Sequence, residues 1–137
     1  MSNMTRTGTA RLADPHAPVR FTAVAGEALA IGDACFIHSD GLAYQCDATD
    51  HVSIANVSAF EGICLSTCVA GQPVTLFGIG SKIWISDTSQ TIASFWFVGN
   101  TQGTLSSAKV ATSDTDKPVG KMITANVMEV VHSGGIS

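Results

Sequence analysis

Apolar and polar residues alternate over short runs along most of this chain. In the run Lys-Ile-Trp-Ile-Ser at residues 82–86, both isoleucines fall on one face of an extended chain and Trp84 falls on the other. No longer window shows the period of about 3.6 residues that an amphipathic helix requires. The pattern therefore predicts short β-strands rather than helices.

Turn residues separate these runs. Asp40-Gly41 lies between the apolar runs Ala34–His38 and Leu42–Cys46. An Asp-Gly pair in this position is a strong hairpin signal, because glycine reaches positive φ without a Cβ clash. A related turn, Ala70-Gly71-Gln72, precedes the β-prone run Pro73–Phe77. The sequence predicts a hairpin over residues 34–46 and another strand directly after the second turn.

The same signals predict strands through the rest of the chain. The predicted strands are residues 19–25, 34–38, 42–46, 61–67, 73–77, 82–86, 94–98, 104–107, 118–123 and 126–131. Asp50 is a possible cap for one short helical turn near residues 50–58, although β-branched residues there disfavour a helix. Closely spaced short strands with turns between them indicate an all-β barrel or sandwich with at most one or two short helices.

At 137 residues the chain is most simply one domain with extended ends. Residues 1–18 are polar and end in two prolines, so we expect an extended N-terminal arm that contributes no core residue. Residues 19–132 form the predicted β-rich domain, and residues 133–137 form a flexible tail.

Three of the seven basic residues lie in the first twenty positions, where Asp14 is the only acid. These are Arg6, Arg11 and Arg20. One interpretation is a solvated tail, because chain termini are often disordered. The other is an arm that lies on the acidic surface of a partner, where each arginine pairs with a carboxylate.

Composition narrows the classes of function. With 45% hydrophobic and 13% charged residues, the chain suits either burial in an assembly or a β-protein whose surface is covered by Ser and Thr. The net charge of −4 argues against general binding to nucleic acid, which needs a basic face. We find no apolar run long enough for a transmembrane helix and no secretory signal, so we expect neither a membrane partner nor export.

No set of residues has the spacing of a catalytic or metal site. The four cysteines, Cys35, Cys46, Cys64 and Cys68, lack zinc-ligand spacing and are expected to be reduced, buried and apolar in character. The four histidines are scattered, and there is no Gly-x-Ser-x-Gly motif around a serine. Asp47, Asp50 and His51 lack the acidic density of a calcium loop. We therefore expect no enzyme activity, no cofactor and no metal.

Five motifs, in order, resemble the small head decoration proteins of tailed bacteriophages, also called capsid cement proteins. The motifs are Gly26-Glu-Ala-Leu-Ala-Ile-Gly-Asp-Ala34, Asp40-Gly-Leu-Ala-Tyr44, Glu61-Gly-Ile63, Ala70-Gly-Gln-Pro-Val-Thr-Leu-Phe77 and Pro118-Val-Gly-Lys-Met122. The resemblance covers about residues 20–131. Each motif consists mainly of turn residues and aliphatics, so the order and spacing of the set carry the resemblance.

The resemblance implies a fold of the β-tulip type, assembly as a homotrimer and binding to the major capsid protein. The protein would then be a structural component on the exterior of the virion, after synthesis in the host cytoplasm. It would stabilise the shell at three-fold and quasi-three-fold positions and make no direct contact with nucleic acid. The shared positions carry over no defined set of functional residues.

Candidate interface residues come from charge and alternation. They are Arg6, Arg11, Arg20, Trp84 and Trp96. Alternation places Trp96 opposite Phe95 and Phe97, so one face of that strand points away from the core unless a second layer covers it. Core packing of Trp96 remains open. The alternative function is a small carbohydrate- or surface-binding module that stacks its ligand on Trp84, Trp96 and Tyr44.

Overall fold

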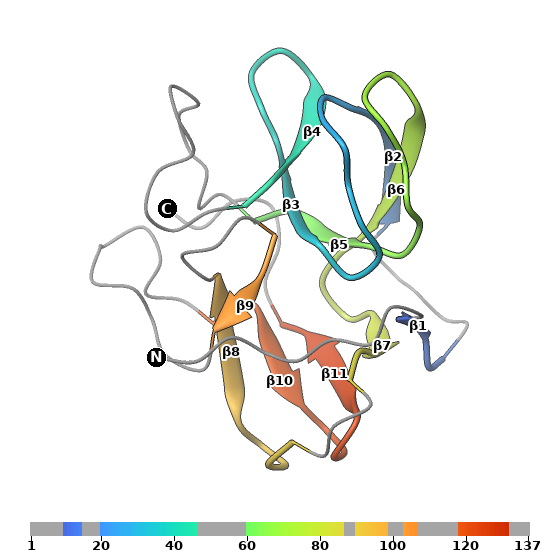
Figure 1. Ribbon diagram of the computed structural model, residues 1–137. Helices are drawn as coiled ribbons and strands as arrows, with labels where there is room; N and C mark the ends of the chain where they lie inside the picture. Colours follow the sequence, from blue (N-terminus) through green and yellow to red (C-terminus); the bar gives the residue numbers. More distant parts are fainter. Residues whose placement is uncertain are drawn as a thin grey trace.

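The chain folds into two β-structures, a closed barrel and a six-stranded sheet (Figure 1). The computed structural model describes residues 10–14, 20–46, 60–86, 90–98, 103–106 and 118–131. Within these ranges there are eleven strands and no helix, which confirms the predicted all-β class of barrel or sandwich. The possible helical turn at 50–58 and the tail at 133–137 lie outside the described residues.

The barrel is built from residues 20–77. Its strands are β2 (Arg20–Ala25), β3 (Ala34–Ile37), β4 (Leu42–Gln45), β5 (Gly62–Cys64) and β6 (Pro73–Phe77). They follow the order β2-β4-β3-β5-β6, and antiparallel pairing of β2 with β6 closes the ring. The β2–β4 pair is parallel, whereas the other pairs are antiparallel.

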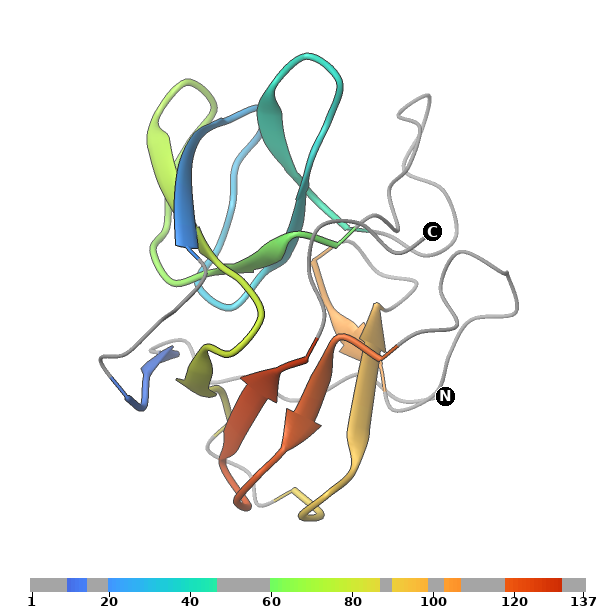
Figure 2. The ribbon, with the colours of Figure 1, turned by 180° about the vertical axis from the view of Figure 1, so that it is seen from behind.

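The sheet takes its strands from both ends of the chain. They are β1 (Arg11–Leu12), β7 (Lys82–Trp84), β8 (Phe95–Val98), β9 (Leu105–Ser106), β10 (Gly120–Met122) and β11 (Val127–Val130). Their spatial order is β1-β7-β11-β10-β8-β9, and every neighbouring pair is antiparallel. Figure 2 shows the barrel and the sheet from behind, with β7 directly following the last barrel strand.

The hairpin predicted at Asp40-Gly41 joins β3 to β4. The amide of Gly41 donates to the carbonyl of His38 at 2.8 Å, and Gly41 has φ +85°. One carboxylate oxygen of Asp40 accepts the Leu42 amide at 2.9 Å. Asp40 thus holds the turn while glycine supplies the left-handed conformation that the turn needs.

The N-terminal segment contributes to the packed domain. Strand β1 pairs with β7, with Arg11 opposite Trp84 and Leu12 opposite Ile83. Ala10 is buried with the core side chains, so the expectation that residues 1–18 hold no core residue is wrong at this position. A two-residue strand has too short a pattern to be found by alternation; its partner β7 supplies the edge that holds it.

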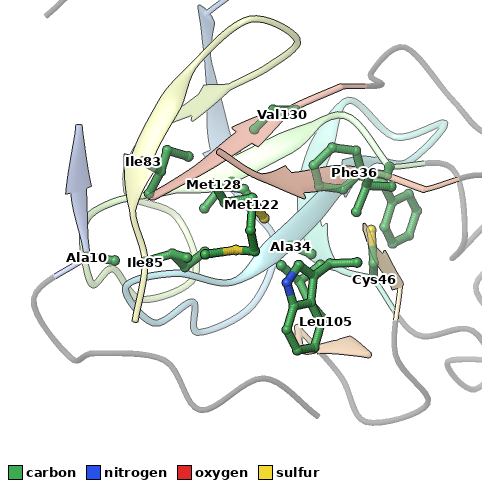
Figure 3. Close-up of a cluster of buried hydrophobic side chains, with 14 residues drawn as sticks. Ala10, Ala34, Phe36, Cys46, Ile83, Ile85, Leu105, Met122, Met128 and Val130 are labelled. Atoms are coloured by element: carbon green, nitrogen blue, oxygen red, sulfur yellow. The ribbon is translucent and has the colours of Figure 1, made fainter. Parts of the chain in front are cut away.

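Two hydrophobic cores meet at β3. Phe36 and Ala34 point toward the sheet and pack in a cluster with Ile83, Met122 and Met128 (Figure 3). Cys35 points the opposite way, into the barrel, with side chains that include Leu29, Ala43, Cys64, Val74 and Leu76. Because β3 and β5 are buried on both faces, their sequences are nearly continuous apolar runs and do not alternate between apolar and polar residues.

We expect Ile83→Ala to lower the free energy of unfolding by about 2–5 kcal/mol, because the fully buried side chain leaves a cavity between sheet and barrel. Ile92→Ala is the matched control; its side chain is 63% exposed and should change stability by less than about 0.5 kcal/mol. Urea unfolding measures both. Equal stability of the two variants would contradict the proposed position of this core.

Candidate functional site

The candidate site is the solvent-facing side of the six-stranded sheet. Ile83, Met128 and Met122 point into the core, so alternation sends their strand neighbours to the other side. We call this side the outer face and define it by Arg11, Lys82, Trp84, Phe95, Lys121 and Glu129. All six are exposed or half-buried.

Two cation–aromatic pairs organise the outer face. The guanidinium carbon of Arg11 lies 4.4 Å from the centre of the Trp84 ring, across the β1–β7 pair. The amine of Lys121 lies 5.6 Å from the centre of the Phe95 ring, across the β10–β8 pair. Each distance falls within the range of a favourable cation–π contact. The structure thus brings together two of the predicted interface residues, Arg11 and Trp84.

Trp96 lies on the other side of the sheet. Its side chain is only 5% exposed and belongs to the core between sheet and barrel, which is the core-packing alternative that the sequence left open. Its strand partner is Gly120, where an added Cβ would clash with the side chain of the core residue Met128. Phe95, 45% exposed, takes the outward position instead. The indole Nε1 of Trp96 has no hydrogen-bond partner among the described residues.

The remaining predicted interface residues lie elsewhere. Arg20 is exposed at the start of β2 in the barrel, opposite Phe77, and is not part of the outer face. Arg6 lies outside the described residues. Sequence reasoning did not single out Lys82, Lys121 or Phe95. The alternation at residues 82–86 placed Lys82 beside Trp84, but the pairing with β10 and β8 was needed to find the other two.

A cluster of polar and aromatic side chains lies at the tip of the β3–β4 hairpin, apart from the outer face. The Tyr44 hydroxyl donates to the Asp40 carboxylate at 2.7 Å, and the His38 ring meets the Tyr44 ring edge-on at 5.8 Å between centres. A Cβ at Gly26 would clash with the Tyr44 ring, so the ring covers the backbone there. These contacts give Tyr44 a structural role in place of the free stacking surface that the carbohydrate hypothesis required.

Asp33 lies directly before β3, where the barrel approaches Gly103 next to the sheet. This carboxylate is 1% exposed and accepts hydrogen bonds from the Ala30 amide at 2.8 Å and from the Gln45 side chain at 2.7 Å. Gly103, just before β9, has φ +77° and leaves no room for a Cβ beside Asp33. Its carbonyl accepts the Ala34 amide at 2.9 Å. The two donors satisfy a carboxylate that would be costly to bury without hydrogen bonds.

The cysteines are buried thiols inside the fold. Hydrogen bonding with Cys64, followed by burial, raises the pKa of the Cys35 thiol well above its usual range. Burial also raises the pKa of Cys68. In the parts of the chain that the structure describes, no three His, Cys, Asp or Glu side chains form a group that could hold a metal ion. The barrel thiols act as small apolar side chains, as the sequence suggested.

No protein-family model matches the chain, and no curated protein matches it either. Within the described residues, no helix is long and apolar enough to span a membrane.

We expect Tyr44→Phe to raise the pKa of Asp40. The Tyr44 hydroxyl, followed by the Leu42 amide, holds the pKa of this carboxyl below its ordinary value, and the variant keeps the ring but loses the first donor. Because the folded pKa is depressed, the carboxylate stabilises the hairpin above the unfolded pKa, near about 4, and loses that effect as the pH falls through the folded value. Carboxyl NMR titration measures the shift, with the other carboxyl groups as internal reference. An unchanged Asp40 pKa would contradict the proposed bond.

Proposed function

We propose that this chain is a structural decoration protein that binds the outer surface of a tailed-phage capsid and stabilises the shell. The proposal rests on the ordered resemblance to capsid cement proteins. It includes a homotrimer, the major capsid protein as partner and a position on the virion exterior. A β-tulip-type fold belongs to the same proposal.

The observation that carries the proposal is the place of the shared motifs in the fold. All five lie at turns or on strands. The first motif leads into β3, and the second spans the β3–β4 turn and the start of β4. The third overlaps β5, the fourth contains a turn and β6, and the fifth contains β10. Ala34, the last residue of the first motif, donates its amide to the Gly103 carbonyl next to the sheet, and Asp40-Gly41, from the second, makes the hairpin turn. Motifs that specify architecture, and not a catalytic centre, support a protein whose work is binding and assembly.

The carbohydrate-binding alternative has less support from the side chains. It needs aromatic rings free to stack on a ligand. Trp96 is in the core, Arg11 lies over the Trp84 ring, and the Tyr44 hydroxyl is bonded to Asp40. Trp96 is thus removed from the surface, and Trp84 and Tyr44 are half-buried side chains already engaged in contacts within the fold. A protein-binding surface makes better use of the same arrangement, because aromatic and arginine side chains are enriched in interfaces.

Stabilisation by decoration follows from mass action. A ligand that binds the assembled shell but not its separated subunits shifts the equilibrium toward the shell, by RT ln(1 + [L]/Kd) for each site. Each bound trimer would contact neighbouring capsid subunits, so opening the shell would require breaking its contacts as well.

Expanded shells that lack the protein should bind it in co-sedimentation and then disrupt at a higher temperature. An unrelated β-protein of similar size and charge is the control for crowding and nonspecific binding. Light scattering follows disruption as the temperature rises. Failure to co-sediment, or identical disruption temperatures for naked and decorated shells, would overturn the proposed function.

A further inference from the structure

Charge is unevenly distributed over the fold. Four of the basic residues lie in the described ranges, and three of them, Arg11, Lys82 and Lys121, share the outer face. Glu129 is the only acid in that set; Asp14 follows the end of β1 at the edge of the sheet. The chain as a whole has a net charge of −4. The outer face is therefore locally positive on an acidic protein.

The strand register arranges these charges in a row. Lys82 lies opposite Glu129, Glu129 opposite Lys121, and Lys121 opposite Phe95. Neighbouring strands are about 4.8 Å apart, so the row spans roughly 14 Å across four strands. Arg11 and Trp84 form a second row two residues further along β7. The surface combines spaced positive charges with an aromatic side chain in each row.

The aromatic rings prepare two of the cations for binding. The Trp84 ring covers one side of the Arg11 guanidinium, and the Phe95 ring covers one side of the Lys121 amine. Each contact restricts the rotamers of the cationic side chain and displaces part of its hydration shell. Arg11 still has N–H donors that can pair with a carboxylate in the bidentate manner of a guanidinium. A carboxylate that arrives here meets a donor that has already lost part of its conformational entropy.

We infer that the outer face docks an acidic surface of a partner protein, with Arg11, Lys82 and Lys121 pairing with its carboxylates. This inference rests on the proposed function in one respect: the partner would be the shell protein. A protein surface fits better than nucleic acid, because its separate carboxylates can flank Glu129. A nucleic acid carries phosphates at fixed short intervals along its backbone and so cannot leave a gap at Glu129.

The test uses a short oligoglutamate peptide as probe and an oligothymidylate of matched charge as its rival. Trp84 reports binding by fluorescence, since the other tryptophan, Trp96, is buried. We expect the peptide to bind at low salt and to be released as salt rises. The variant Arg11→Gln/Lys82→Gln/Lys121→Gln should bind it roughly tenfold more weakly or worse. Arg20→Gln removes the fourth described cation, in the barrel, and should bind like the wild type.

A measurement on the unmodified protein covers the case in which the triple variant does not fold. Carbodiimide joins lysine amines to carboxylates in contact, and mass spectrometry maps the joined residues. A higher yield of cross-linked peptide at Lys82 and Lys121 than at Lys109 and Lys117 supports the inference. No binding of the peptide, equal losses in both variants, or tighter binding of the oligothymidylate would overturn it.

The shell experiment separates this inference from the proposed function. If the wild type binds shells and the triple variant binds them equally well, the outer face is not the docking surface and the decoration function stands. If the peptide binds at the outer face but shells do not bind the wild type, the acidic-partner surface stands and the decoration function fails.

Discussion

The structure depends on burial of β3 on both of its faces. Ala34 and Phe36 complete the core under the sheet, while Cys35 between them completes the core of the barrel. One strand therefore belongs to two cores, and a slip of a single residue in its register would exchange the two sets of side chains. Two features directly at the start of this strand hold the register: the hydrogen-bonded Asp33 carboxylate, and the hydrogen bond that the Ala34 amide donates to the Gly103 carbonyl.

The sequence predicted the β-strands well because their signals are local. The bounds of β6 are those of the predicted strand, and the alternation around Trp84 placed the inward isoleucines correctly. The Asp40-Gly41 turn was found from two residues, since the side chain and the backbone of a tight turn act over a few positions. Other strands were predicted slightly too long, as for residues 61–67, where only Gly62–Cys64 pair as β5.

What the sequence could not predict depends on contacts between distant segments. Alternation shows that Trp96 and Phe95 face opposite ways, but only the strand register puts Trp96 on the face that carries Met122 and Met128 and so sends the indole inward. Strand β1 exists because β7 offers it an edge about seventy positions away in the chain. The candidate site has the same origin. Arg11 and Trp84 were singled out separately, whereas their contact, and the row that contains Lys121, arise from the order of strands in the sheet.

The shortness of the outermost strands has a consequence for how copies of this chain associate. Strands β1 and β9 bound the sheet, and each has two residues. An edge this short offers few unpaired backbone groups to a strand from another molecule, and short edges protect β-proteins from indefinite edge-to-edge growth. Contacts between molecules are therefore directed to side chains on faces and loops. Side-chain contacts can be specific for one partner and end at a defined size, whereas backbone pairing along an open edge has no built-in stopping point.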